Sequence, residues 1–402
     1  MEKKKSVLIV INSLELGGAQ KSLVSFLKCL VETGEIRRYD IDLLIAKPCG
    51  MFYPDVPEEV HMIPSPPELM WLGTPSGDPL LEENPSRRGK VGKLLWKLSL
   101  KQVPLHHALN EEQRLWLNWR SLIPEYPKTY DVAVSYMNGF PNYYVIDKVR
   151  AARKVLWIHN EYEKLRYDIA FDAPYYDACD RIITISDACK ESYLKFYPRH
   201  REKIDVLENI TLASDILARG EDGDAPEFDG AEHRILSVGR LSAQKQFELA
   251  VSAAAVLKRR GTSFRWLIVG EGEDRDALQK QIDQEGLSGE FELIGLRTNP
   301  YPYLKHCSVF VQTSLFEGKS IVLDEAKIYG KPIIATDYPT VYDNLENEKT
   351  GLIVPMEPEA VADAVERVLG DAGLRERLKD NLRGAQGNEK ELIRYLHLQM
   401  GD

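Results

Sequence analysis

The sequence predicts an α/β protein of two domains, each built on a parallel β-sheet. Its 402 residues are more than one ordinary core accommodates. Short apolar runs alternate with helical patterns, which is typical of parallel α/β sheets. This alternation restarts in the second half of the chain. We therefore expect domains at 1–215 and 216–385, with a final helical segment, 386–402, packing back on the first domain.

The expected strands are short runs rich in Val and Ile. In the first domain they are Ser6–Ile11, Ile41–Ala46, Val132–Tyr136, Val155–Ile158 and Ile182–Ile185. In the second they are Ile235–Val238, Trp266–Val269, Phe291–Ile294, Val309–Gln312, Ile333–Ala335 and Leu352–Val354. The clearest expected helices are Ala19–Glu32, Asp187–Phe196, Gln244–Arg260, Arg275–Glu285 and Ala360–Leu369. Two such sheets in tandem leave a cleft between them, and open parallel sheets bind ligands beyond the carboxyl ends of their strands.

Two segments lack the alternation. Residues 64–128 begin with a cluster of prolines that breaks regular elements, so we expect an irregular insertion there. Residues 218–232 are rich in Gly, Asp, Glu and Pro and show no apolar period. We expect them to form a surface excursion at the domain boundary.

Composition and charge bear on the partners and the cellular location of the protein. The net charge of −10 argues against a nucleic-acid partner. The five cysteines are scattered and form no C-x-x-C pair, which fits a reducing compartment. No stretch reaches the about 18 apolar residues of a membrane-spanning helix, and the first apolar run is too short for a signal peptide. We expect a cytoplasmic protein, with peripheral attachment to a membrane still open.

A basic stretch inside the insertion is one reason to consider peripheral attachment to a membrane. Lys90, Lys93, Lys97 and Lys101 share one face of a helical wheel, and apolar residues occupy the neighbouring face. This pattern suits a helix lying on an anionic membrane. It suits equally a solvated basic face whose apolar side packs on the protein core.

Four motifs stand out in the second domain, and three of them follow expected strands. After the first strand, Gly239 and Arg240 precede Lys245 at the start of a helix. Two cations at such a turn suit a diphosphate. An ordinary turn with solvated cations would give the same pattern. After the second strand, the Gly270-x-Gly272 spacing allows a ligand to approach the backbone, or forms a plain tight turn.

The third motif is the most informative about function, and the fourth the least. Glu317 stands eight residues before Glu325, with a helix expected from about Ser320. The positive end of that helix would face the ligand of Glu317, and Glu325 could accept both hydroxyls of a ribose. The alternative is two surface glutamates beside an amphipathic helix. The fourth motif, Gly330-Lys331-Pro332, is a helix-to-strand return with a structural explanation of its own.

Taken in order, these motifs resemble the family-four retaining glycosyltransferases of the GT-B architecture, in particular those that build bacterial capsules and exopolysaccharides. The segments Leu16–Gln20 and Ile183–Asn209 add to the resemblance, which covers most of the chain and is weakest over 48–130. It implies two Rossmann-like domains facing across a cleft, with the acceptor on the first and a nucleotide-diphosphate sugar, most simply a UDP-sugar, on the second.

The resemblance also implies roles for the matching positions. Gly17 and Gly18 would face the diphosphate, and Arg240 and Lys245 would stabilise it as leaving group. Glu325 would bind the ribose, and His159 would lie near the reacting sugar. The remaining donor contacts would come from Gly239, Gly270, Gly272, Glu317, Gly318, Lys319, Ser320 and Ile321. Catalysis would rest on Glu317, His159, Arg240 and Lys245, with no metal or other cofactor required.

The turn after Glu317 departs from the family pattern. Where the family has Gly-Phe-Gly, this chain has Gly318-Lys319-Ser320. Ser320 lacks the backbone freedom of glycine, and its hydroxyl could cap the following helix. Three functions therefore stay open: transfer of a sugar to a glycan or lipid-linked acceptor, non-catalytic binding of a nucleotide sugar or glycan, and epimerisation of a nucleotide sugar.

Overall fold

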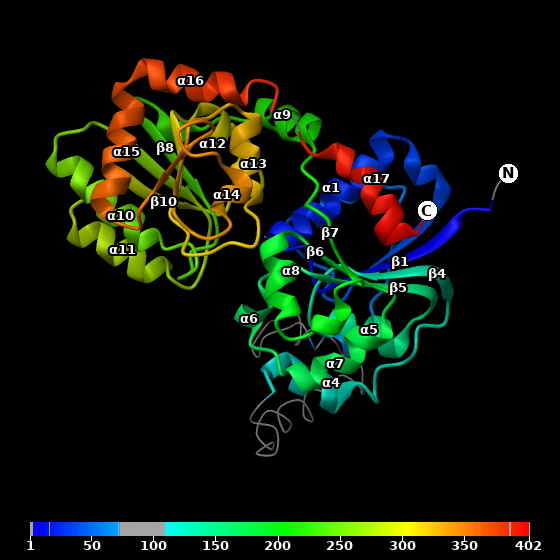
Figure 1. Ribbon diagram of the computed structural model, residues 1–402. Coiled ribbons are helices and arrows are strands. Elements are labelled where there is room, and N and C mark those ends of the chain that lie inside the picture. The colour runs from blue at the N-terminus through cyan, green and yellow to red at the C-terminus, as the bar shows by residue number, and fades with distance from the viewer. Residues whose placement is uncertain (1–2, 16, 71, 73–108, 386, 402) are drawn as a thin grey trace. The chain divides into compact units, whose positions relative to one another are not determined.

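The structure, a computed structural model, describes residues 3–15, 17–70, 72, 109–385 and 387–401. The chain divides into two compact units (Figure 1). Unit 1 comprises Met1–Ile210 and Asn388–Asp402, and unit 2 comprises Thr211–Gly387. Each unit has its own parallel sheet, which confirms the predicted fold class.

The sheet of unit 1 has seven parallel strands in the order β3-β2-β1-β4-β5-β6-β7. They are β1 (Lys5–Ile11), β2 (Tyr39–Ile45), β3 (His61–Ile63), β4 (Thr129–Ser135), β5 (Arg150–Ile158), β6 (Arg181–Thr184) and β7 (Ile204–Val206). Strand β1 pairs through Val7 with Ile41 on one side and Val132 on the other. The strand order reverses between β1 and β4, and this is the point at which open sheets of this kind bind ligands.

Helices cover both faces of this sheet. They are α1 (Gly18–Glu32), α2 (Pro67–Met70), α4 (Glu111–Trp119), α5 (Phe140–Lys148), α6 (Tyr162–Leu165), α7 (Ile169–Ala178), α8 (Asp187–Leu194), α17 (Leu392–Tyr395) and the π-helix η8 (Leu396–Met400). Short 3₁₀ turns are η1 (Glu35–Arg38), η2 (Tyr53–Asp55), η5 (Pro198–His200) and η7 (Glu389–Glu391). On β5, Leu156 and Ile158 belong to the core under α4, α5, α7 and α8. Trp157, which alternates with them, packs against Tyr395 of α17 on the opposite face.

Unit 2 repeats the plan with six parallel strands in the order β10-β9-β8-β11-β12-β13. They are β8 (Arg234–Val238), β9 (Arg265–Val269), β10 (Phe291–Gly295), β11 (Val309–Gln312), β12 (Ile333–Thr336) and β13 (Leu352–Val354). The helices are α9 (Ala213–Glu221), α10 (Phe247–Arg259), α11 (Arg275–Gln284), α12 (Tyr301–His306), α13 (Ile321–Ile328), α14 (Val341–Asn344), α15 (Pro358–Gly370) and α16 (Ala372–Leu382), with the 3₁₀ turn η6 (Pro226–Phe228). Here the strand order reverses between β8 and β11.

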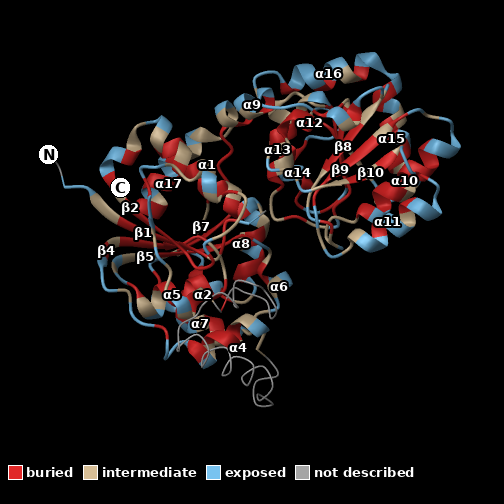
Figure 2. Ribbon diagram, turned by 180° about the vertical axis from the view of Figure 1, so that it is seen from behind, coloured by how far each residue is buried: buried red, intermediate tan, exposed pale blue. Residues whose placement is uncertain are grey.

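Both faces of the unit 2 sheet are buried. Ile235 and Trp266 point into a core shared with α10 and α15, whereas their neighbours Leu236 and Leu267 point into a core shared with α12 and α13. Figure 2 shows the result as buried strands between helices whose outer faces are exposed. Since both faces are covered, the strands are apolar over most of their length, as buried parallel strands are.

The two segments expected to be irregular contain regular structure. Within 64–128, the helix α4 begins at a capping box in which Asn110 and Gln113 exchange hydrogen bonds with each other's backbone. Within 218–232, α9 continues to Glu221, and Phe228 is only 1% exposed. Neither expectation was right in full. The capping box starts a helix, and the buried Phe228 side chain packs its segment on the core, despite the proline and glycine content around them.

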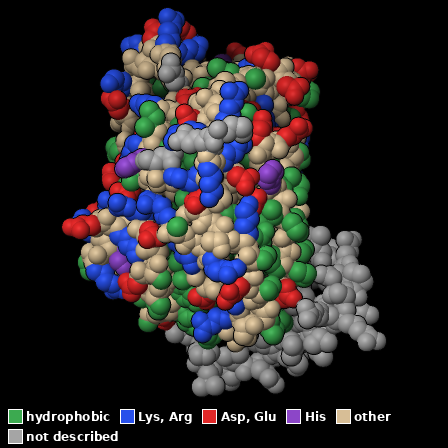
Figure 3. Space-filling view, turned by 90° about the vertical axis from the view of Figure 1, so that its right-hand side faces the viewer, with side chains coloured by type: hydrophobic (Ala, Val, Ile, Leu, Met, Phe, Trp, Pro, Cys, Tyr) green, Lys and Arg blue, Asp and Glu red, His purple; other side chains and the backbone are tan. Residues whose placement is uncertain are grey.

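Surface charge on the face shown in Figure 3 is mixed, with Lys, Arg, Asp and Glu side chains interspersed. Within the described ranges, no helix combines the length and the apolar character needed to cross a membrane. The basic set Lys90, Lys93, Lys97 and Lys101 lies outside the described residues.

A buried carboxylate joins the helices on one face of unit 1. Asp172 of α7 is 1% exposed and accepts hydrogen bonds from Gln113 of α4 at 2.7 Å and Tyr143 of α5 at 2.6 Å. The Tyr162 hydroxyl of α6 donates to it at 2.5 Å. Burial raises the pKa of Asp172, and the three donors act against that shift.

We expect Asp172→Ala to destabilise the protein by about 3 kcal/mol or more, because three buried donors lose their acceptor at about 1–3 kcal/mol each. The measurement is urea unfolding of the full chain at neutral pH. The control is Glu191→Ala on α8, whose carboxylate is 61% exposed and pairs with Arg201; an exposed pair contributes about 1 kcal/mol or less. Equal effects of the two substitutions would contradict the role of Asp172.

Candidate functional site

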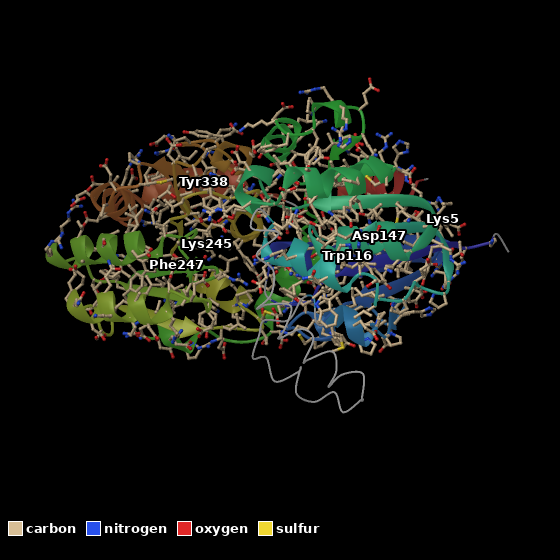
Figure 4. All side chains as sticks on the ribbon, turned by 90° about the horizontal axis from the view of Figure 1, so that it is seen from below. Lys5, Trp116, Asp147, Lys245, Phe247 and Tyr338 are labelled. Atoms are coloured by element: carbon tan, nitrogen blue, oxygen red, sulfur yellow. The ribbon has the colours of Figure 1, made fainter. Side chains whose placement is uncertain are left out.

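The candidate site of unit 2 lies at the reversal of its strand order. Lys245 follows β8 and Glu317 follows β11, the two neighbouring strands at that point. The Lys245 Nζ atom lies 2.5 Å from Glu317 Oε1, and the two side chains are 16% and 10% exposed. Figure 4 labels Lys245 beside Phe247, the first residue of α10. The pair thus ties the β8–α10 loop to the β11–α13 loop.

Further hydrogen bonds fix the Glu317 carboxylate. Ser314 Oγ donates to Oε1 at 2.7 Å, and Gln244 Nε2 donates to Oε2 at 3.3 Å. Thr340 Oγ1 donates to the backbone carbonyl of Glu317 at 2.8 Å. Because the carboxylate accepts from three side chains, its orientation is set before any ligand binds.

Hydrogen bonds to Gln312 and Asn344 fix the end of the Gly318-Lys319-Ser320 turn. Ser320 is the N-cap residue of α13, yet its hydroxyl donates to Gln312 Oε1 at 2.7 Å and makes no cap bond, contrary to expectation. The Asn344 side chain accepts from the Ser320 N–H and donates to the Ser320 carbonyl. With no capping side chain among the described residues, the first N–H groups of α13, starting at Ile321, are suited to an anion. Gly318 and Lys319, half-buried, form the turn itself.

The glycines of the neighbouring loop have a structural cause. A Cβ atom on Gly270 would lie 1.8 Å from the carbonyl oxygen of Gly239, and one on Gly272 would lie 2.1 Å from that of Leu241. The Leu241 N–H donates to the Glu271 carbonyl at 3.0 Å in the same contact. The Gly-x-Gly spacing is therefore required by the two loops themselves, which pack backbone against backbone.

Arg240 and Glu325 sit in opposite surroundings. Arg240, one residue after Gly239, is exposed. Glu325, in the second turn of α13, is 2% exposed, and the Tyr301 hydroxyl donates to it at 3.4 Å. The sequence pattern revealed neither the exposure of Arg240 nor the burial of Glu325.

In unit 1, the predicted residues also lie beyond the carboxyl ends of strands. Gly17 is the N-cap of α1 in an extended conformation and Gly18 is the first residue of that helix, which follows β1. Gly50 keeps this loop in place: a Cβ atom there would lie 2.0 Å from the Leu14 backbone, and its φ of +127° also favours glycine.

His159 directly follows β5 and is 7% exposed. Its Nε2 lies 3.0 Å from the Tyr136 carbonyl oxygen, so this nitrogen carries the proton and donates. Its Nδ1 is buried and has no partner among the described residues. Burial lowers the pKa of His159 to about 4, against the opposing effect of the Tyr136 carbonyl. The imidazole is therefore neutral at pH 7, with one free acceptor nitrogen.

Sequence reasoning missed the residues that support the site. They are Gln244, Gln312, Ser314, Thr340 and Asn344. Gln244, Ser314 and Thr340 lie in loops that follow strands, which was the available signal, but polar residues are common in such loops. Gln312 ends β11 and Asn344 ends α14. Across the described part of the chain, no three His, Cys, Asp or Glu side chains are grouped to hold a metal ion.

Comparison with known proteins gives a family match within unit 2. Residues 219–384, all within unit 2, match the family described as glycosyl transferases group 1. The chain is 36% identical over 151 residues to alpha-D-kanosaminyltransferase of Streptomyces kanamyceticus, covering 37% of this chain and 39% of that protein. It is 29% identical over 207 residues to the N-acetylgalactosamine-N,N'-diacetylbacillosaminyl-diphospho-undecaprenol 4-alpha-N-acetylgalactosaminyltransferase of Campylobacter jejuni, covering 51% and 55%. The matches thus span about half or less of these relatives' length.

Among solved structures, the Anabaena protein HepE in complex with UDP and glucose superposes with a TM-score of 0.67. The match covers 99% of this chain and 100% of that protein at 16% identity. Together with the two parallel sheets, it confirms the GT-B fold that the motifs indicated.

The low pKa of His159 predicts a pH-dependent stability. The folded-state pKa of about 4 lies below the usual histidine value of 6.5, so the contribution of the neutral imidazole to stability is present above pH 6.5 and is lost as pH falls toward 4. At pH 5 the loss is about 2 kcal/mol relative to pH 7.5. His159→Gln keeps a donor for the Tyr136 carbonyl and cannot titrate. Urea unfolding at both pH values should show the wild type losing about 2 kcal/mol more than this variant; equal losses would refute a buried neutral imidazole.

Proposed function

We propose that this chain, which carries a glycosyl transferases group 1 domain, is a retaining glycosyltransferase that moves a sugar from a UDP-sugar to a glycan or lipid-linked acceptor. The observation that carries the proposal is the arrangement at the strand reversal of unit 2. There the anchored Glu317 carboxylate, the start of α13 and the Arg240 loop adjoin one edge of the sheet. Polysaccharide and glycolipid synthesis is the setting that the relatives' names support.

Glu317 and the start of α13 would hold the donor. A carboxylate fixed by Lys245 and Ser314 accepts hydroxyl donors from a sugar without reorganising. The N–H groups after Ser320 would bind the diphosphate, since a helix N-terminus favours negative charge. Gly17 and Gly18 would add the start of α1 from unit 1.

Arg240 would stabilise the leaving group. As the bond from the anomeric carbon to the diphosphate oxygen breaks, negative charge develops on the diphosphate, and a fixed cation lowers the energy of that state. The acceptor oxygen bonds to the anomeric carbon from the same face, and its proton passes to the departing diphosphate. Lys245 would act mainly through Glu317, with which it is already paired.

His159 would orient the donor sugar. Its Nε2 donates to the Tyr136 carbonyl, so its Nδ1 can only accept. A sugar hydroxyl is a donor that matches it. Since the imidazole stays neutral down to about pH 4, this role would hold across the physiological range.

A ligand panel followed by a transfer assay tests the proposal. Thermal shifts with nucleotide diphosphates and UDP-sugars should rise with ligand concentration, because a ligand that binds the folded state stabilises it by mass action. The donor so identified, carrying a labelled sugar, should then label a glycan or lipid-linked acceptor. Tight donor binding without turnover over a broad acceptor panel would instead support a binding module, and an epimerised free donor would support an epimerase.

Arg240→Ala should lower turnover about 10²–10³-fold, the effect of removing one donor that stabilises developing charge. The side chain is exposed, so the urea midpoint should stay within the experimental error. Lys245→Ala is the informative comparison, because it should lower turnover and stability together, leaving Glu317 without its cation. Unchanged turnover in Arg240→Ala would exclude Arg240 from the leaving-group role.

Glu325→Gln should weaken UDP binding about tenfold, because two charge-assisted hydrogen bonds to the ribose hydroxyls would each become neutral and lose about 0.7 kcal/mol. The measurement is calorimetric titration with UDP. Glu346→Gln, which alters an exposed carboxylate paired with Lys349, is the control and should leave the affinity unchanged. An unaltered affinity in Glu325→Gln would remove Glu325 from the ribose role.

A further inference from the structure

A stack of aromatic rings surrounds His159. The imidazole lies on the Trp157 indole, with centroids 5.0 Å apart and planes 10° from parallel. The Tyr136 ring lies 4.6 Å from the Trp157 ring and 5.4 Å from the imidazole. All three residues come from the carboxyl ends of β4 and β5.

The C-terminal segment closes the other side of this stack. Tyr395 is fully buried, and its ring lies 5.5 Å from Trp157 and 5.1 Å from Phe26 of α1. The Trp157 indole N–H donates to Gln399 Oε1 at 2.8 Å, and Gln399 is also fully buried. Residues more than two hundred positions away in the sequence thus contact the ring on which His159 rests.

Hydrogen bonding alone does not fix the imidazole. Its single bond, from Nε2 to the Tyr136 carbonyl, leaves the ring free to tilt about that axis. Stacking on Trp157 sets the tilt, and so aims Nδ1. The Trp157 ring is fixed in turn, because a buried indole N–H costs free energy unless it is paired, and Gln399 provides its acceptor.

We propose that Tyr395 and Gln399 are positioning residues that set the orientation of the His159 imidazole through Trp157. The C-terminal segment of unit 1 therefore serves the reaction as well as the fold. The inference rests on the proposed function, in which His159 accepts a hydroxyl of the donor sugar.

The principal test is Tyr395→Leu in the full chain, with two comparison variants. Tyr395→Phe keeps the ring and removes the hydroxyl that donates to the Glu208 carbonyl at 2.9 Å. It should lower the urea midpoint but keep the wild-type His159 titration and turnover. Leu396→Ala, at the next position, removes a comparably buried apolar side chain that is not in the stack. It should lower the urea midpoint without altering His159.

Two measurements separate positioning from simple packing. NMR titration of the His159 imidazole should show the pKa rising in Tyr395→Leu from about 4 toward 6.5, and unchanged in Tyr395→Phe and Leu396→Ala. Turnover at saturating donor should fall about tenfold to a hundredfold, as for a small misplacement of a reacting group, with UDP affinity within about twofold of wild type. This loss in kcat without loss of nucleotide binding is not expected of a general packing defect.

A folded Tyr395→Leu variant with wild-type titration and turnover would overturn the proposal. If that variant does not fold, Gln399→Met keeps every ring and removes only the acceptor of the Trp157 N–H. It should shift the titration and turnover in the same direction, and wild-type values for both would be equally decisive against the proposal. If the wild type transfers no sugar, the proposed function fails, whereas the titration still decides whether the C-terminal segment positions His159.

Discussion

The ion pair between Lys245 and Glu317 is the interaction around which the unit 2 site is built. Two charges that are mostly buried are tolerated only when each neutralises the other and the remaining lone pairs are bonded. This requirement explains the polar residues nearby: Ser314 and Gln244 complete the bonding of the carboxylate, and Thr340 holds its backbone. The loops after β8 and β11 consequently keep one geometry at the point where the sheet can receive a ligand.

Unit 1 reaches a comparable rigidity by other means. His159 follows β5, the neighbour of β4. Its imidazole is neutral and has one hydrogen bond, so ring packing rather than charge pairing fixes its orientation. Farther from the sheet, Asp172 collects donors from three helices. The two units share a sheet plan, yet one fixes its site by electrostatics and the other by aromatic stacking and buried hydrogen bonds.

Much of the fold was predictable because buried parallel strands are apolar over most of their length. Runs such as Val309–Gln312 and Leu352–Val354 matched the structure without change. The short strands β3 and β7, at the two edges of the unit 1 sheet, were missed, because His61 and Asp205 interrupt their apolar runs. Within the site, the positions of Lys245 and Glu317 followed from their strands, whereas their contact with each other did not. The burial of Glu325 and the bond from Ser320 to Gln312 depend on tertiary neighbours that spacing cannot reveal.

The chain leaves unit 1 after Ile210 and returns to it at Asn388, which places unit 2 inside the linear order of unit 1. The two crossings are adjacent, because the Asn388 side chain donates to the Asn209 carbonyl at 2.8 Å. Residues 211–387 are thus a cassette with neighbouring ends, the arrangement that tolerates domain insertion. A chimera that exchanges unit 2 with that of a relative should therefore replace this cassette as a whole and retain residues Asn388–Asp402 with their own unit 1.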